Sequence, residues 1–415
     1  MSDAAVPEGS FPAAGLSVET VLADLDARLA RDPDVHGARL FGLVYPTGNP
    51  ALEDLLAAVN RRYLFHNALN PFKFPEVAAL EAEVVGMTGA LLHLAGDGGG
   101  SMTSGGTESI LMSMLVNRER ARARGVARPQ ILAPVSAHPA YAKAAHYFDM
   151  DVVPVPLDDR YRADVDAAAA LIGPDTAVVV ASAFSYPYGI MDPVADLAAL
   201  AAEHGAGCHV DACIGGFVLP FLERLGVAVP SWDFRVPGVT EISADIHKYG
   251  FAPKGASVVL HRDADWFGHQ VFLYDRWPSG LYGSPGVAGA RSAAPIATAW
   301  AVLRHLGAAG YVEIARELRE TTRDFRAAVE AIPGLEVVGD PIGPVLAFTS
   351  SVVDPEAVGA AMDARGWHLN RIVDPPGLHC MLSPAHAGVL DDLVDDLRAS
   401  VAAPGESPGA PVRYS

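Results

Sequence analysis

The sequence has 415 residues, of which 50% are hydrophobic, and its 49 acidic and 30 basic residues give a formal net charge of -19. That length allows two or three domains with a large buried core, whereas the negative charge disfavours nucleic acids and anionic membrane surfaces as non-specific partners. The three cysteines, Cys208, Cys213 and Cys380, have no metal-ligand spacing, so they predict reduced thiols in a cytoplasmic protein without a metal site.

The amino-terminal segment, residues 1–75, is predicted to hold helices and substrate-side loops. Its first residues lack a secretory signal and, like the tail at 404–415, are rich in Pro, Gly, Ala and Ser, which predicts disorder. No apolar run reaches the length of a membrane span, so no membrane anchor is expected. Helices are expected at 17–30 and at about 50–63, with a loop around Tyr45 between them and an Asn/Pro-rich loop after them.

A glycine-rich turn in GDGGGSMTSGGTESILMSMLVNRE, residues 96–119, runs directly into an apolar helix. Glycines let the backbone approach a phosphate closely, and the first N–H groups of the helix attract it. Gly105, Gly106 and Thr107 are the expected contacts. A flexible turn without a ligand is the alternative interpretation, and the absence of a Walker lysine argues against a P-loop.

Short β-branched runs alternate with helical patterns from Gln130 to His261. This alternation predicts an α/β fold whose mainly parallel sheet is covered on both faces, within a large domain at 76–309. The helices and strands that follow predict a smaller, carboxyl-terminal α+β domain at 310–403.

Two polar residues follow strands of the predicted sheet, at the edge where such sheets bind ligands. His138 could stack on a planar ring or cap the next helix. Asp211 could pair with a protonated pyridine nitrogen, because a buried carboxylate needs a cationic partner, or it could act as a cap.

The stretch SADIHKYGFAPKG, residues 243–255, places Lys248 after an extended segment and before a loop. Such a lysine can form a Schiff base with an aldehyde cofactor, although a surface lysine in a turn is the alternative. The following VFLYDRWPSGLYGSPGVAGARS is expected to be a Gly/Pro-rich loop that leads into a long helix.

Taken in order, the phosphate turn, His138, Asp211 and the His-Lys pair resemble the fold-type I, pyridoxal-phosphate-dependent enzymes of the group II decarboxylase superfamily. Longer stretches are similar to the sphingosine-1-phosphate lyase family in particular, namely SMTSGGTESILM, SAHPAYAKAAHYF, HVDACIGGFVLPF, DFRVPGVTEISADIHKYGFAPKGASVVL and LYGSPGVAGAR. The resemblance implies pyridoxal 5'-phosphate as cofactor and a small-molecule amine as substrate.

The resemblance also assigns roles to individual residues. It implies that Lys248 holds the cofactor as a Schiff base, that Asp211 pairs with its pyridine nitrogen and that His138 stacks on its ring. The other implied cofactor contacts are Gly105, Gly106, Thr107, His247 and Cys213. The implied substrate-binding residues are Tyr45, which is also a catalytic candidate, and Asn70, Lys254 and Arg291. Arg291 is expected to reach a neighbouring subunit's site, so a homodimer with shared active sites is implied.

The sequence departs from the family on the substrate side. Asn70 and Tyr188 each stand where the family has a histidine, Phe72 stands where Asp is usual, and Ala290 replaces a serine. Asn70 can hydrogen-bond a phosphate, but it cannot carry a charge or exchange a proton near neutrality.

The implied reaction is a retro-aldol type cleavage of a carbon–carbon bond in a β-hydroxy amine, with or without a phosphate group, that releases an aldehyde and an amine. Amino-acid decarboxylation is the alternative reaction, which the departures leave open. A catalytically silent scaffold is a third hypothesis, and the intact set of cofactor residues argues against it.

Overall fold

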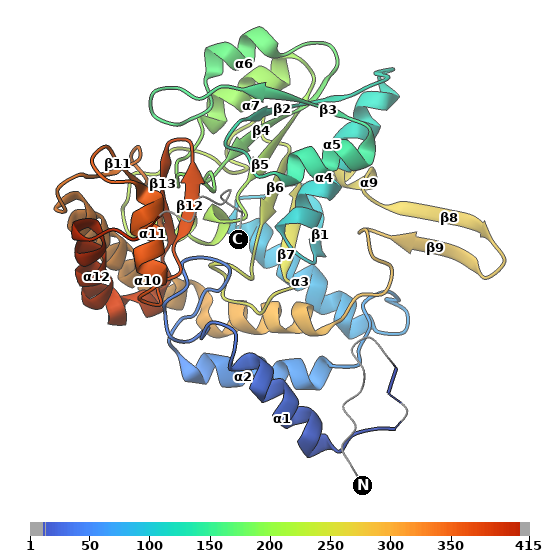
Figure 1. Ribbon diagram of the computed structural model, residues 1–415. Coiled ribbons are helices and arrows are strands. Elements are labelled where there is room, and N and C mark those ends of the chain that lie inside the picture. The colour runs from blue at the N-terminus through green and yellow to red at the C-terminus, as the bar shows by residue number, and fades with distance from the viewer. Residues whose placement is uncertain (1–10, 13, 407–415) are drawn as a thin grey trace.

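The computed structural model describes residues 11–12 and 14–406 (Figure 1). The predicted disordered start and tail therefore lie largely outside the described residues. The described chain is built around a seven-stranded sheet, a separate four-stranded sheet and a two-stranded hairpin. Within these residues, no helix combines the length and the apolar character that a bilayer span requires.

The seven-stranded sheet has the strand order β1-β7-β6-β5-β4-β2-β3. Strands β3, β2, β4, β5 and β6 pair in parallel, whereas β7 runs antiparallel to both β6 and β1. The predicted α/β fold with a mainly parallel sheet is confirmed. The strand bounds are β1 (Gly99–Thr103), β2 (Gln130–Pro134), β3 (Asp151–Val155), β4 (Thr176–Ser182), β5 (Gly207–Asp211), β6 (Glu241–Ala244) and β7 (Ser257–His261).

Helices cover both faces of this sheet because its central strands are apolar on both sides. In β4, Val178 and Val180 pack with α4 (Gly106–Ala123) and α5 (Ala140–Phe148). Val179 and Ala181, which point the other way, lie on the face that α7 (Val194–Glu203) covers at β4, and α3 (Pro75–Leu91) packs beside β1 and β7. Successive side chains of a strand alternate between faces, so a continuous apolar run requires cover on both.

Shorter helices complete this unit. They are α6 (Val165–Leu171), the 3-10 turn η1 (Gly215–Phe217), α8 (Leu219–Arg224) and α9 (Ala264–Gly268).

The amino-terminal helices lie where the sequence predicts them. They are α1 (Val18–Leu29), in which Ser17 Oγ accepts a cap hydrogen bond from Thr20 N, and α2 (Pro50–Tyr63). Helices α2 and α3 pack against the long helix α10 (Ala294–Glu330). Helix α1 buries none of its residues.

Helix α10 connects the large sheet to the smaller unit (Figure 1), and the predicted domain boundary at residue 310 falls inside it. The helix is broken at Gly307, whose φ of 54° and ψ of -176° are not helical. The smaller unit is an antiparallel sheet of order β10-β11-β13-β12. Its elements are β10 (Leu335–Val337), β11 (Val345–Ser350), α11 (Pro355–Asp363), β12 (Asn370–Val373), β13 (Pro376–Met381), η2 (Pro384–Val389) and α12 (Leu390–Ala402).

The prediction of a loop after the lysine stretch is wrong in its first half. Strands β8 (Phe272–Trp277) and β9 (Gly280–Ser284) form a hairpin that projects from the body of the protein (Figure 1). Pro278 and Ser279 make the reversal, and Gly280 follows with a φ of 95° that favours glycine. Every residue of β8 is exposed.

Candidate active site

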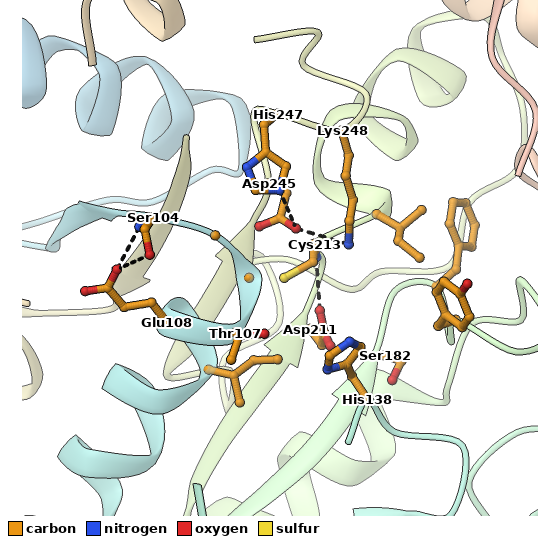
Figure 2. Close-up of a pocket in the computed structure, with 16 residues that line it drawn as sticks. Ser104, Thr107, Glu108, His138, Ser182, Asp211, Cys213, Asp245, His247 and Lys248 are labelled. Atoms are coloured by element: carbon orange, nitrogen blue, oxygen red, sulfur yellow. Dashed lines mark hydrogen bonds and ion pairs between the residues drawn. The ribbon is translucent and has the colours of Figure 1, made fainter. Parts of the chain in front are cut away.

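A cavity of about 330 Å³ opens at the carboxyl ends of strands β1, β2, β4, β5 and β6 (Figure 2). Its volume lies within the range of small-molecule sites. The sheet topology explains the place, because ligands of open α/β sheets bind at this edge. The lining residues are Ser104, Gly105, Gly106, Thr107, Glu108, Ile110, His138, Ser182, Phe184, Tyr186, Asp211, Cys213, Ile214, Asp245, His247 and Lys248.

The predicted phosphate turn forms one wall of this cavity, between β1 and α4. The first helical hydrogen bond is from Ser109 N to Gly105 O, so the amides of Gly106, Thr107 and Glu108 precede it and have no helical partner. A Cβ at Gly106 would lie 2.7 Å from Cys213 Sγ and 2.9 Å from Asp245 Oδ2. Only glycine fits there, at a helix amino terminus of the kind that binds anions.

Asp211 ends strand β5 and is 7% exposed. One carboxylate oxygen, Oδ1, accepts a hydrogen bond from Cys213 N at 3.1 Å. Burial, Asp211 and Asp245 raise the pKa of the neighbouring Cys213 thiol, which therefore stays protonated and behaves as a small apolar group.

Lys248 follows β6 and reaches back to the same cavity (Figure 2). Its Nζ lies 3.1 Å from Asp245 Oδ2, which is also 3.6 Å from His247 Nε2. Burial alone would lower the pKa of Lys248, but Asp245, Tyr45, Cys213 and Asp211 outweigh it and raise that pKa well above the ordinary value. Burial would likewise raise the pKa of Asp245, but the nearby Lys248 and His247 lower it. The two groups therefore form an ion pair.

His138 lines the cavity between β2 and α5. Its Nδ1 accepts a hydrogen bond from Ala140 N at 3.1 Å, so it also takes part in the local turn that starts α5. Burial lowers the pKa of the ring, which keeps it neutral. One conformation of His138 thus caps the turn before α5 and also places the ring at the cavity wall, where it could stack on a planar ligand.

The cavity residues fit a pyridoxal phosphate on chemical grounds. The helix terminus offers amides to a phosphate, Lys248 offers an amine to an aldehyde, and Asp211 offers a carboxylate to a ring nitrogen. Asp245 Oδ1 is buried and has no hydrogen-bond partner among the described residues, so the site retains acceptor capacity beyond its own ion pair.

Tyr45 and Lys254 lie close together beside the lysine stretch. Lys254 Nζ is 4.6 Å from the centroid of the Tyr45 ring and donates to the carbonyl of His247 at 3.3 Å. Lys254 has an exposed side chain, yet protein atoms crowd its ammonium. This burial, together with the charge of Lys248, lowers the pKa of Lys254 to about 8. Tyr45 lines a second, shallower cavity of about 400 Å³.

Asn70 and Arg291 do not line the main cavity of their own chain. Asn70 Oδ1 accepts hydrogen bonds from Phe72 N and Lys73 N, both at 3.0 Å, and the Phe72 side chain is 93% exposed. Arg291 makes a two-point ion pair with Glu81, at 2.8 and 2.9 Å. Their roles in substrate binding stay predictions.

Tyr188, one of the departures from the family, also lies away from the cavity. Its hydroxyl donates to the carbonyl of Asp374 in the smaller unit, and its ring lies 5.0 Å from that of Tyr161. Tyr188 therefore contributes to the contact between the large sheet unit and the smaller carboxyl-terminal unit.

Several cavity residues were not predicted from the sequence. Asp245 is the most important of them, since it pairs with Lys248. It lies three residues before Lys248 in the same stretch, and this spacing could have indicated the pair. Glu108 follows the predicted phosphate contacts directly. Ser182, the last residue of β4, and Phe184 and Tyr186 after it also line the cavity, and the buried apolar run of β4 gave no sign of a site at its end.

Comparisons with known proteins agree with this geometry. Residues 9–351 match the pyridoxal-dependent decarboxylase conserved domain. The chain is 41% identical to a sphingosine-1-phosphate lyase of Oryza sativa subsp. japonica over 96% of its length and 75% of the relative's. It is 40% identical to sphingosine-1-phosphate lyase 1 of Mus musculus over 94% of its length and 69% of the relative's.

Two solved structures are also similar to this chain. The sphingosine-1-phosphate lyase of Burkholderia pseudomallei superimposes with a TM-score of 0.91 at 41% identity, covering 95% of this chain and 92% of that one. A glutamate decarboxylase of Lactobacillus brevis superimposes with a TM-score of 0.85 at 20% identity, over 98% of this chain and 97% of that one, and shares the fold.

Proposed function

We propose that this chain cleaves phosphorylated sphingoid bases, because it belongs to the pyridoxal-dependent decarboxylase family and within it to the sphingosine-1-phosphate lyases. The reaction breaks a carbon–carbon bond of a β-hydroxy amine and releases an aldehyde and a phosphorylated amine. The observation that carries the proposal is the single cavity in which Lys248, Asp211, His138 and the phosphate turn meet, in a chain 41% identical to such a lyase over 96% of its length.

Bound pyridoxal phosphate supplies an aldehyde that captures amines and a ring that withdraws electrons from the bond to be broken. Lys248 is the residue that would hold this aldehyde. Asp245, whose Oδ2 lies 3.1 Å from Lys248 Nζ, pairs with the lysine ammonium when that nitrogen is not attached to the cofactor. The buried carboxylate of Asp211 would keep a proton on the ring nitrogen, because a cationic partner offsets the cost of burying its own charge.

The remaining cavity residues position the reacting groups. The amides of Gly106 and Thr107 and the ring of His247 would bind the cofactor phosphate, and neutral His138 would stack on the cofactor ring. Cys213 would offer a small side chain to that ring. Tyr45 and Lys254 bind the anionic head of the substrate, and a lysine can bind either a phosphate or a carboxylate.

The test is an incubation of the purified enzyme with sphinganine 1-phosphate and shorter phosphorylated β-hydroxy amines, with aldehyde as the readout. Carbon dioxide release from a panel of amino acids is measured in parallel. Aldehyde from at least one phosphorylated amine is expected, whereas carbon dioxide without aldehyde would replace the proposal with an amino-acid decarboxylase. A protein that neither binds pyridoxal phosphate nor forms either product would be the silent scaffold.

The protein is also proposed to act as a homodimer with shared active sites. The apolar face of α1, formed by Val18, Val21, Leu22, Leu25 and Leu29, is exposed, and so is the apolar hairpin β8–β9. Exposed apolar side chains that cluster in this way favour an interaction site. The loop that carries Asn70 is joined to Arg291 by the hydrogen bond from Ala68 N to Arg291 O, so both substrate-side residues would reach a neighbouring cavity together.

A cytoplasmic location is proposed from the cysteines. Cys208, Cys213 and Cys380 are all buried as free thiols, which suits a reducing compartment. A fluorescent fusion of the full chain that appears outside the cytoplasm would contradict this location.

A further inference from the structure

Two glutamates connect the end of β1 and the phosphate turn after it to the loop that follows the hairpin, residues 285–291. Glu108 Oε2 accepts hydrogen bonds from Ser104 N at 2.8 Å and from Ser104 Oγ at 2.6 Å (Figure 2), and its Oε1 accepts from Val287 N at 3.0 Å. Glu81 Oε1 accepts from Met102 N at 3.1 Å, and the same carboxylate binds the guanidinium of Arg291. Glu108 therefore joins the phosphate turn to the loop 285–291, and Glu81 joins strand β1 to the same loop.

The loop 285–291 lies so close to its neighbours that a larger residue would not fit easily at position 286. A Cβ at Gly286 would lie 3.0 Å from Glu108 Oε1. Ser284 Oγ donates to the carbonyls of Gly286 and Ala288, at 3.1 and 3.2 Å, and Gln270 donates to the carbonyl of Pro285. Residues 284–288 thus form a compact turn, and Glu108 joins this turn to the phosphate turn.

The charge of Glu108 makes its position unexpected. It is the third residue of α4, in the first turn of a helix whose amino terminus faces the anion site. A carboxylate there would repel a phosphate if it pointed into the site. Both of its oxygens instead accept hydrogen bonds from groups at the edge of the site, and charge-assisted bonds of this kind are the strong ones.

We propose that Glu108 is a positioning residue that fixes the phosphate turn against the loop 285–291, so that the affinity for the cofactor and the order of this loop depend on each other. Fixing Ser104 sets the direction of the amides of Gly106 and Thr107, which follow it directly. Fixing Val287 sets the start of the segment that ends at Arg291. The inference rests on the cofactor site of the proposed function and involves no substrate.

The test compares Glu108→Ala and Glu108→Gln in the full-length holoenzyme. Release of pyridoxal phosphate is followed by equilibrium dialysis and absorbance, and the protection of Val287 N is followed by hydrogen exchange. Glu108→Ala is expected to raise the dissociation constant of the cofactor about tenfold and to speed exchange at Val287, since three hydrogen bonds to a charged group are lost. Glu108→Gln is expected to weaken binding less, because its amide oxygen still accepts from one of the two segments.

Glu119→Gln is the matched control, because Glu119 lies on the same helix and pairs only with the neighbouring Arg118 among the described residues. It should change neither readout. Unchanged or tighter cofactor binding by Glu108→Ala, or unchanged protection at Val287, would overturn the proposal. Should Glu108→Ala fail to fold, Ser104→Ala serves instead, with a smaller loss of affinity expected and an unchanged affinity as the contrary result. Because neither readout uses a substrate, a negative aldehyde assay leaves this test intact.

Discussion

Lys248 and Lys254 belong to one short stretch, yet the structure gives them different surroundings. Lys248 is paired with Asp245 inside the cavity, whereas Lys254 lies over the ring of Tyr45 with an exposed stem. Replacing Lys248 with Ala is therefore expected to abolish covalent attachment of the cofactor and turnover. The measurement is borohydride reduction followed by mass analysis of the peptide that contains the site, with Lys254→Ala as the control that keeps attachment. Turnover by Lys248→Ala at the wild-type rate would refute the assignment.

Asp211 is expected to act on the rate more than on cofactor binding. Asp211→Asn keeps the shape and the contact with Cys213 N but removes the negative charge that holds a proton on the ring nitrogen. We expect the variant to retain cofactor and to lose roughly a hundredfold or more in kcat, the size typical for the loss of a preorganised charge. Steady-state kinetics on cofactor-saturated protein test this, and a kcat within a few-fold of wild type would contradict it.

Lys254 is expected to give substrate binding a pH dependence. Burial lowers its pKa to about 8, so the ammonium is charged below pH 8 and becomes neutral as the pH rises through that value. A phosphorylated substrate should therefore show a KM that rises above pH 8. Lys254→Arg should remove this rise, because a guanidinium stays charged throughout. A KM profile that is flat from pH 7 to pH 9 in the wild type would exclude the role.

The residues of the site differ in how far the sequence could reveal them. Lys248, Asp211, His138 and the phosphate turn each lie at or just after the end of a strand, so the sequence could place them at one edge of the sheet, and the structure brings them into one cavity. Asp245 was missed because a carboxylate near a lysine is common, and only the fold shows that it is 2% exposed and points at Nζ. The partners of Arg291 could not be predicted either, since Glu81 is distant in sequence.

Helix α10 depends on one glycine at its break. Gly307 has a φ of 54° and a ψ of -176°, a combination that essentially only glycine adopts. Gly307→Ala is expected to lower the free energy of unfolding by about 1–3 kcal/mol through backbone strain, although no atom lies within 4 Å of the added Cβ. The measurement is the midpoint of thermal unfolding monitored by circular dichroism.

Gly86 provides a matched control for that strain. It lies inside α3 with helical geometry, is exposed, and also has no atom within 4 Å of an added Cβ. Gly86→Ala should therefore raise the midpoint, since alanine is the better helix former by about 1 kcal/mol. A midpoint of Gly307→Ala at or above that of the wild type would show that the break is not strained for alanine.

At the scale of elements, the sequence predicted the helices and strands that have a clear hydrophobic period. The buried runs of β4 and β5 and the amphipathic helices have clear periods, and they lie where expected. Strand β1 was hidden in a glycine-rich segment, and β8 and β9 were hidden by Pro278 and several glycines, because these residues are typical of turns. Pairing with β7 makes β1 a strand, and no local pattern shows such a partner.

The dimer is testable through its two exposed apolar surfaces. Leu25→Asp in α1 and Trp277→Asp in the hairpin are each expected to shift the protein from dimer to monomer, because a charge at a buried apolar contact is costly. Sedimentation velocity measures the change. Leu171→Asp, at an exposed leucine of α6, is the control and should sediment like the wild type. A wild-type protein that is monomeric at every concentration would contradict the dimer.

The position of β1 in the sheet affects the order in which parts of the protein can fold. β1 lies at the edge of the large sheet and pairs only with β7 there, so that Gly99 meets His261. Closing so long a segment is entropically costly and slow. During synthesis on the ribosome, β1 can join the large sheet only after β7 has emerged. We therefore expect the edge of the cavity that β1 forms to be completed late, although its residues are among the first of the cavity to be translated.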